Sequence, residues 1–286
     1  MSNDKIPVPR EPLPLDAIEA IRAAFTDRPL VAFAEEHRSE PQHAFIRTLV
    51  RHPRICSIVD TIVVEFGNAR FQPTVDRYLS GGRVAGAQLR RAWLETTQGK
   101  VWDAPMYERF FTTMRAVNRS LPGGGGIRVL LGDPPIDWST IHDHRELEGW
   151  AGRRNAYFAA VVEDEVLRPG RRALLIAGGF HLFHRQPHNE TARLEHRHGD
   201  CVFVVLPQGQ STATFDAYQP RMASWPAPAL ALLPGTWLGS LPVSVLGRIE
   251  LSAGTGGPPR LADWADAYLY LGIGRPSRQQ AGAGST

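Results

Sequence analysis

Residues 58–66 read IVDTIVVEF, from Ile58 to Phe66, and this stretch decides the fold class. Val63 and Val64 lie in a continuous apolar run, which is typical of a strand buried on both faces of a sheet. Strands of that kind belong to parallel sheets whose two faces are covered by helices. Glu65 directly ends the run, so the stretch predicts a buried strand that places a carboxylate at its carboxyl end.

Apolar and helical stretches alternate on both sides of this strand. Further strands are expected at Leu30–Ala34, Ile127–Leu131, Arg171–Ala177 and Cys201–Leu206, with a last candidate at Ala267–Leu271. Helices are expected at Asp16–Phe25, Arg38–Arg51, Arg153–Val166 and Asn189–Arg197, with two or three more between Phe71 and Ser120. The alternation predicts an α/β fold with a mainly parallel β-sheet flanked by helices. We expect the helical insertion of about residues 71–120 to lie over the carboxyl ends of the strands.

Composition divides the chain into three parts. Residues 1–14 hold four prolines and predict an extended arm, residues 15–276 a single α/β domain, and residues 277–286 a disordered tail. No apolar run approaches the ~20 residues that span a bilayer, and the start lacks the apolar segment of a secretory signal, so we expect a cytoplasmic protein with no membrane partner. The net charge is +3 with scattered basic residues, which argues against nucleic acid. The expected partner is a small-molecule substrate, and the oligomeric state stays open.

Ionisable side chains follow four of the predicted strands. Glu35, Glu36 and His37 follow the first strand, and Glu65 and then Asn68 end the second. Asp133 ends the third strand, and the fourth leads into Gly178-Gly179-Phe180-His181 and then His184. Because ligands bind outside the carboxyl ends of parallel strands, these positions predict one polar site.

Each of these residues also has a purely structural interpretation. His37 fits a helix cap or a solvated loop, and Glu36 fits the first turn of a helix, where the dipole favours a carboxylate. Asp133 lies in Gly-Asp-Pro-Pro, a turn signal that favours a structural role. Glu65 requires a partner if it is buried, so an ion pair and a function are compatible. The polar stretch 142–148 is interpreted as a solvated face.

Several familiar chemistries are excluded by missing motifs. Neither Cys56 nor Cys201 is a strong candidate nucleophile, and the only lysines, Lys5 and Lys100, lie in polar segments that do not suit Schiff-base chemistry. Gly123 to Gly126 lack the Gly-Lys-Ser/Thr of a phosphate-binding loop, and neither a Gly-x-Ser-x-Gly elbow nor an HExxH zinc motif is present. His181, His184 and His188 resemble a metal cluster only by spacing. What remains is a histidine and a glutamate acting on water or on a hydroxyl of the substrate.

The same residues carry a family resemblance. The stretch 31–37 (VAFAEEH), followed by His43, resembles the Gly-Glu-x-His opening of the erythromycin-esterase-like, ChaN-like and Tiki superfamily. The stretch 63–68 (VVEFGN) resembles its second-strand motif, 178–181 (GGFH) its second Gly-x-x-His motif, and 153–155 (RRN) its arginine before a helix. The resemblance spans about residues 28–206. Ala34 stands where the family has glycine, which changes the local loop geometry.

The resemblance implies a fold and a site, and it leaves three functions open. In the first, a hydrolase acts on an ester or lactone, with His37 as base, Glu35 or Glu65 orienting it, His181 as second acid or base, and Arg154 or Arg153 stabilising negative charge. The expected substrate-binding residues are Glu36, His43, Asn68, Arg153 and His184. In the second, the chain binds haem without covalent attachment. In the third, Glu35, His37, Glu65 and His181 hold a metal ion. No cofactor is assigned.

Overall fold

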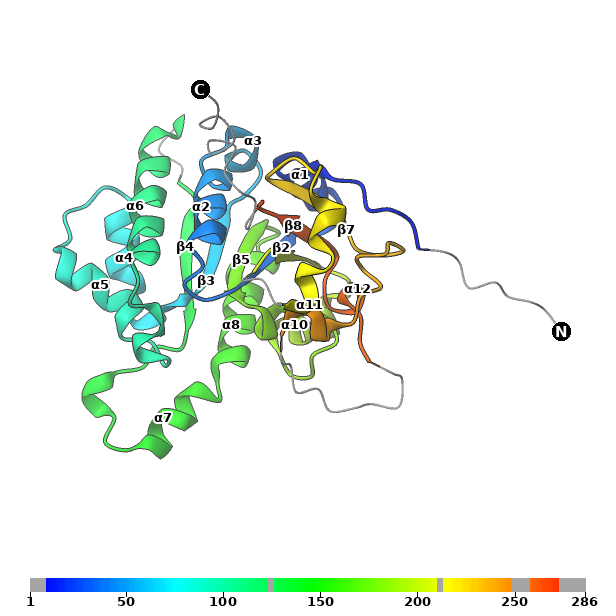
Figure 1. Cartoon of the computed structure of the whole chain (residues 1–286). Helices are drawn as coiled ribbons and strands as arrows, with labels where there is room; N and C mark the ends of the chain where they lie inside the picture. Colours follow the sequence, from blue (N-terminus) through cyan, green and yellow to red (C-terminus); the bar gives the residue numbers. More distant parts are fainter. Residues whose placement is uncertain (1–8, 123–125, 210–212, 248–257, 273–286) are drawn as a thin grey trace, which may run out of the picture.

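The computed structural model describes residues 9–122, 126–209, 213–247 and 258–272, and its centre is one eight-stranded sheet (Figure 1). The strands are β1 (Leu15–Asp16), β2 (Leu30–Glu35), β3 (Thr61–Asn68), β4 (Arg128–Asp133), β5 (Ala173–Gly178), β6 (Val202–Pro207), β7 (Ala229–Leu232) and β8 (Ala267–Tyr270). Their order across the sheet is β1-β7-β8-β6-β2-β5-β3-β4. Strands β8, β6, β2, β5, β3 and β4 run parallel, whereas β7 is antiparallel to β8 and to β1.

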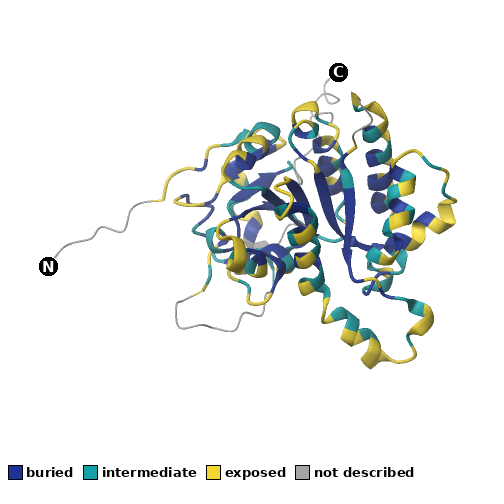
Figure 2. Ribbon diagram, turned by 180° about the vertical axis from the view of Figure 1, so that it is seen from behind, coloured by how far each residue is buried: buried dark blue, intermediate teal, exposed yellow. Residues whose placement is uncertain are grey.

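Helices cover both faces of this sheet. They are α1 (Ala17–Asp27), α2 (Glu40–Leu49), α3 (Pro53–Cys56), α4 (Gln72–Leu79), α5 (Gly86–Leu94), α6 (Pro105–Ser120), α7 (His144–Ala151), α8 (Arg154–Val162), α9 (Gly179–Leu182), α10 (Glu190–His198), α11 (Ala213–Asp216) and α12 (Leu261–Trp264). Figure 2 shows that the strands are buried, while the helices expose their outer sides. The expected α/β fold is confirmed.

Side-chain alternation along the strands builds two separate cores. In β2, Val31 and Phe33 pack with helices α1 to α6, whereas Ala32 and Ala34 pack on the opposite face with α8, α10 and α12. The same rule directs Glu35 toward the α2–α6 face. In β3, Val63 belongs to the α8–α12 face, so Glu65 points to that side. The two carboxylates expected in one site therefore leave the sheet on opposite faces.

Local sequence sets where several helices begin. Asp16 caps α1 by accepting from the Glu19 backbone N–H at 2.9 Å, and Asn189 caps α10 by accepting from Ala192 at 2.8 Å. Helix α2 begins at Glu40, two residues later than expected, because Arg38 has a positive φ of 65° and Pro41 suits the first turn. Strands β1 and β7 are additions that the weak apolar pattern of those segments did not predict.

The insertion between β3 and β4 is part of the α2–α6 core. Six of its seven aromatic side chains are buried: Phe71, Trp93, Trp102, Tyr107, Phe110 and Phe111. They belong to the core and line no wall of the pocket described below. The segment around the short 3₁₀ helix η2 (Gly99–Trp102) reaches the strand ends, as Trp102 and Tyr107 show below.

Three expectations concern the remaining segments. The face 142–148 is solvated as expected, since α7 buries none of its residues and projects from the body (Figure 1). Most of the predicted arm, the Gly123–Gly125 turn and the predicted tail at 277–286 lie outside the described residues, so the division into domains stays a prediction. Within the described ranges, no helix has the length and apolar character to cross a membrane.

Candidate active site

A pocket of about 450 Å³ opens at the carboxyl ends of β2, β5 and β6. Its polar side is lined by Glu35, Glu36, His37 and His181, together with Gly178. The position agrees with the rule that parallel sheets bind ligands outside their carboxyl ends. Of the expected site residues, these four ionisable side chains are the ones that line the pocket.

Glu35 anchors one half of the site. Its side chain is fully buried, and its Oε1 accepts hydrogen bonds from the His43 Nε2–H and from the Tyr107 hydroxyl, both at 3.0 Å. Burial alone would raise the pKa of Glu35, but His37 and His43 outweigh it and lower the pKa to about 2. Glu35 is therefore a buried carboxylate that stays ionised. Burial and the Glu35 charge in turn raise the pKa of Tyr107, so its hydroxyl remains a donor.

His37 lies between this carboxylate and the pocket. Its Nδ1 is 3.9 Å from Glu35 Oε1, longer than a hydrogen bond, and the His37 side chain is 33% exposed. The buried Trp102 packs edge-on against the imidazole, with ring centroids 4.5 Å apart. Catalytic hydrogen bonds often shorten when substrate binds. The arrangement presents one edge of the ring to the pocket and the other to an ionised carboxylate.

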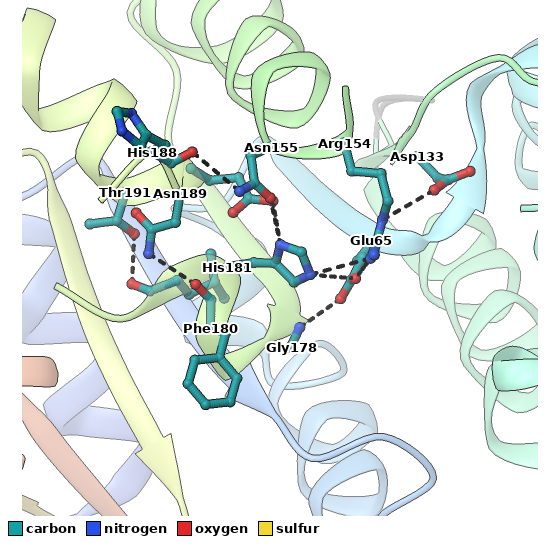
Figure 3. A network of polar contacts seen from close by, with 12 residues as sticks. Glu65, Asp133, Arg154, Asn155, Gly178, Phe180, His181, His188, Asn189 and Thr191 are labelled. Carbon is teal, nitrogen blue, oxygen red and sulfur yellow. Dashed lines mark hydrogen bonds and ion pairs between the residues drawn. The ribbon is translucent and has the colours of Figure 1, made fainter. Parts of the chain in front are cut away.

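Glu65 anchors the second half, on the α8–α12 face of the sheet, and Figure 3 shows its contacts. Its Oε2 accepts from the Gly178 backbone N–H at 2.6 Å, and its Oε1 forms an ion pair with Arg154 and lies 3.1 Å from His181 Nε2. Burial lowers the pKa of Arg154 to about 10, against the raising effect of Glu190, so Arg154 stays charged at neutral pH. The Glu65 carboxylate thus satisfies a buried cation and fixes one side of His181.

Figure 3 shows how the other ring nitrogen of His181 is held. Asn155 donates through Nδ2 to the His188 carbonyl at 3.2 Å, which turns its Oδ1 toward His181 Nδ1 at 2.7 Å. The buried Glu190 also faces Nδ1, at 3.3 Å. Asn155 and Glu190 thus both face Nδ1, while Nε2 lies beside both Glu65 Oε1 and Arg154 Nη2, which is 3.3 Å away.

Gly178 joins the two halves. A Cβ atom built there would lie 2.9 Å from His37 Cε1, 3.3 Å from His37 Nε2 and 3.5 Å from Glu65 Oε2. The bare backbone at the end of β5 thus lets the His37 imidazole and the Glu65 carboxylate approach the same point. His37 lies beside Gly178, and His181 contacts the Glu65 carboxylate that the Gly178 N–H binds. The two histidines therefore lie on two sides of one pocket.

Asp133 supports the second half from β4. It accepts from the Thr97 backbone N–H at 2.8 Å and from the Thr97 hydroxyl at 2.5 Å, and it lies 3.6 Å from Arg154 Nε. Burial raises the pKa of Asp133 to about 7, against the lowering effect of the Thr97 hydrogen bonds. These contacts tie Thr97 to the strand ends, and the structural interpretation of the turn motif stays a prediction.

Two expected substrate-binding residues are buried away from the pocket. His43 is completely buried and bonds Glu35, so it holds this carboxylate in place and does not line the pocket. Asn68 is completely buried, and its side chain bonds the Glu95 and Ile136 carbonyls and the Arg70 backbone N–H. Neither residue lines the pocket, and a role for either in binding a substrate stays a prediction.

Two further expected residues lie outside this pocket. Arg153 is exposed and its guanidinium lies over the Trp150 ring at 5.3 Å, whereas the neighbouring Arg154 enters the site. His184 bonds Asp266 at 2.9 Å and Glu195 at 3.0 Å, outside the pocket. Burial would lower the His184 pKa, but these two hydrogen bonds raise it to about 9. With His188 exposed, the spacing of three histidines does not form a cluster.

The sequence reasoning missed four supporting residues: Trp102, Tyr107, Asn155 and Glu190. Trp102 and Tyr107 have no polar motif around them, and they contact the site only because α6 and η2 pack beside β2. Glu190 directly follows the Asn189 cap of α10, so its position resembles an ordinary first-turn carboxylate. Asn155 belongs to the stretch 153–155 (RRN), in which the arginine carries the resemblance and the asparagine has no signal of its own.

The residues present do not fit a metal centre. Among the described residues, no group of three or more His, Cys, Asp or Glu side chains is placed to hold a metal ion. Glu35 and Glu65 leave the sheet on opposite faces, and the Arg154 cation contacts Glu65 where a metal would compete with it. Haem would need a free axial imidazole. Both ring nitrogens of His181 have partners, which leaves His37 as the candidate in the described part of the pocket.

Comparison with known proteins defines the fold. No protein-family model and no curated protein matches the chain. A crystal structure of a Bacillus cereus protein superposes with a TM-score of 0.57 at 10% identity, covering 91% of this chain and 94% of that one. Similar solved structures also include the type III effector HopBA1, with a TM-score of 0.45, 15% identity and coverage of 74% and 91%. ChaN of Campylobacter jejuni, described for cofacial haem binding, superposes with a TM-score of 0.47 at 12% identity, covering 71% of this chain and 93% of that one. The Bacillus cereus structure, at a TM-score of 0.57, shows a shared overall fold.

Proposed function

We propose that this chain is a hydrolase that activates water with His37 and cleaves a small ester or lactone. One observation carries the proposal: a buried, ionised Glu35 lies behind His37, and the opposite side of the same imidazole faces a pocket. A carboxylate in that position fixes the orientation of the ring and stabilises the imidazolium that forms when it takes a proton.

The reaction is a general-base hydrolysis. Water attacks the carbonyl carbon while its proton passes to His37 Nε2, and the imidazolium is stabilised by Glu35. The carbon–oxygen bond to the leaving group then breaks, and His37 returns the proton to the leaving oxygen. An ester yields an acid and an alcohol, and a lactone yields a hydroxy acid. Atoms and charge therefore balance without a cofactor.

The second half of the site stabilises negative charge. His181 lines the pocket with Nδ1 facing Asn155, and Arg154 lies 3.3 Å from its Nε2. The part of the Arg154 charge that Glu65 leaves uncompensated favours the oxyanion that develops on the carbonyl oxygen. Because Glu65 neutralises part of the Arg154 charge, Arg154 acts mainly as a positioning residue for His181.

The proposal is tested by His37→Ala in a panel of p-nitrophenyl esters and lactones. Loss of a general base should reduce kcat by about 10²–10⁴-fold while the fold is retained. His144→Ala, at a side chain that is 81% exposed, is the matched control and should be fully active. Full turnover by folded His37→Ala protein would overturn the proposal.

Location and partners are part of the same proposal. A cytoplasmic site of action, a small organic substrate, and no nucleic-acid or membrane partner remain predictions from composition. Sensitivity to a chelator tests the remaining alternative. Because the carboxylates diverge, we expect turnover to survive chelation.

A further inference from the structure

A large apolar side chain, Phe180, is exposed beside the proposed catalytic residues. Among the described residues three large apolar side chains are largely exposed, and of these Phe180 is the one that lines the pocket. Phe180 is 57% exposed and directly precedes His181 on α9. A single exposed apolar residue is ordinary on a protein surface, but an aromatic ring in the wall of a pocket supplies binding surface to a ligand. The place of this ring, and not its exposure alone, indicates a role in binding.

The Phe180 ring rests against two buried aromatic rings. Its centroid lies 6.1 Å from that of Phe183 and 6.1 Å from that of Trp264, with interplanar angles of 76° and 68°. Phe183 and Trp264 are buried and stack on each other with centroids 5.0 Å apart. Asn189 holds the backbone of the same turn, because its Nδ2 donates to the Phe180 carbonyl at 3.1 Å and to the Phe183 carbonyl at 2.7 Å. The ring is therefore positioned before a ligand arrives, which lowers the entropic cost of binding.

Phe180 and His181 leave α9 in different directions, as Figure 3 shows. His181 points to Glu65 and Arg154, whereas the Phe180 ring points away from this polar network. Both side chains nevertheless line the same pocket. Two adjacent residues thus present one polar and one apolar surface to a ligand.

The apolar surface continues beyond Phe180. Further apolar side chains line the same pocket and belong to the core of the α8–α12 face or pack against it: Phe183, Leu206, Phe215 and Leu246. The cavity of about 450 Å³ lies in the lower part of the range of about 300–1,000 Å³ that is usual for small-molecule sites. A pocket of this size and lining suits a ligand with one polar reacting group and one compact apolar body.

We propose that Phe180 determines substrate specificity: an aryl group of the substrate packs on its ring while the ester or lactone carbonyl lies at His37 and His181. Aromatic rings pair in offset-stacked or edge-to-face arrangements, and such pairs stabilise beyond the area that they bury. An aryl body therefore gains more at Phe180 than a saturated ring of the same size. The place of the reacting carbonyl rests on the proposed function, whereas the packing of the aryl group on Phe180 does not.

Calorimetric titration with two neutral amides tests the aryl preference without turnover. Phenylacetamide and cyclohexylacetamide carry six-membered rings on the same amide, so the second probe measures apolar burial alone. The ratio of their dissociation constants, cyclohexyl over phenyl, should fall about two- to tenfold from wild type to Phe180→Ala, because aromatic pairing is lost for one probe only. Phe180→Tyr keeps the ring and should keep the ratio. Leu232→Ala, at a side chain that is 48% exposed and outside the pocket, is the matched control and should also keep it.

A kinetic measurement links the preference to the proposed reaction. Hydrolysis of ethyl phenylacetate is followed by proton release at constant pH. Phe180→Ala should raise KM about tenfold with a smaller effect on kcat, because the lost contact is made equally in the ground state and the transition state. A loss confined to kcat would show that Phe180 acts on the catalytic residues, and it would overturn the role in binding.

The outcomes separate this inference from the proposed function. An unchanged ratio in folded Phe180→Ala, or no binding of phenylacetamide to the wild-type protein at millimolar concentration, would overturn the inference. Should Phe180→Ala not fold, Phe180→Leu keeps an apolar side chain of similar size, and the same fall in the ratio is expected there. In His37→Ala the ratio should stay at the wild-type value while turnover is lost. A wild-type protein that hydrolyses no ester, but shows the fall in the ratio, would overturn the proposed function and support the role of Phe180.

Discussion

Replacement of Gly178 by alanine isolates the contact between the two halves of the site. The backbone at Gly178 has φ −57° and ψ 144°, which alanine adopts without strain, and the N–H that bonds Glu65 is retained. The added methyl group would lie 2.9 Å from His37 Cε1, whereas ordinary contacts begin at 3.4 Å. The half-exposed imidazole must therefore move by about 0.5 Å, away from Gly178.

A displacement of this size predicts a loss of activity without a loss of stability. Because a 1 Å misplacement costs about 100-fold in rate, we expect kcat to fall about 10- to 100-fold. The free energy of unfolding should stay within about 1 kcal/mol of wild type, since alanine also restricts the unfolded chain.

The assay is steady-state hydrolysis of the best ester in the panel, paired with urea unfolding. Gly86→Ala is the matched control, because a Cβ atom there meets nothing within 4 Å. A folded Gly178→Ala protein with kcat within twofold of wild type would refute the claim that this contact positions His37.

Three further predictions concern buried charges. Glu65→Gln leaves the Arg154 cation without its carboxylate and should lower the free energy of unfolding by about 3–5 kcal/mol in urea titration; a loss below about 1 kcal/mol would contradict the ion pair. The pKa of His184 is about 9 in the folded protein, against 6.5 for an unperturbed histidine. Its protonation therefore adds about 3 kcal/mol to the free energy of unfolding below pH 6.5, and this contribution is lost as the pH rises through about 9. His184→Gln should flatten that decline in unfolding measured at pH 6 and 9.5, and an equal decline in the variant would contradict it. Tyr107→Phe removes a hydrogen bond to the Glu35 carboxylate and should cost about 1.5–3 kcal/mol of stability together with some kcat, whereas unchanged values would show that His43 suffices.

The fold was predictable because periodicity and strand chemistry agree. The run at Ile58–Phe66 and the alternation around it predict a parallel sheet, and β2 to β6 form where expected. The antiparallel β7 was not predictable, since Ala229–Leu232 is short and follows a proline-rich segment in which no period is visible. Its position depends on pairing with β8, which is a property of the tertiary structure.

The site was predictable in its residues and only partly in its geometry. Glu35, His37, Glu65 and His181 meet at the strand ends because parallel strands deliver their carboxyl ends to one edge. The face to which each carboxylate points depends on the residue at which each strand ends, and a shift of one residue reverses it. His43 was expected to bind a substrate because it lies close to Glu35 in the sequence. The sequence does not show that α6 packs against His43 and separates it from the pocket.

Strand β5 lies between β2 and β3 in the sheet, although it is synthesised after both of them. A growing chain that ends before Ala173 holds both carboxylates but lacks the strand that joins them, so the facing edges of β2 and β3 remain unpaired. Open strand edges of that kind promote pairing with other chains. The order of synthesis thus joins the two halves of the site in the same step that pairs the facing edges of β2 and β3. A ribosome that stalls in this interval would leave a chain prone to aggregation, and a C-terminal truncation before β5 would yield insoluble protein.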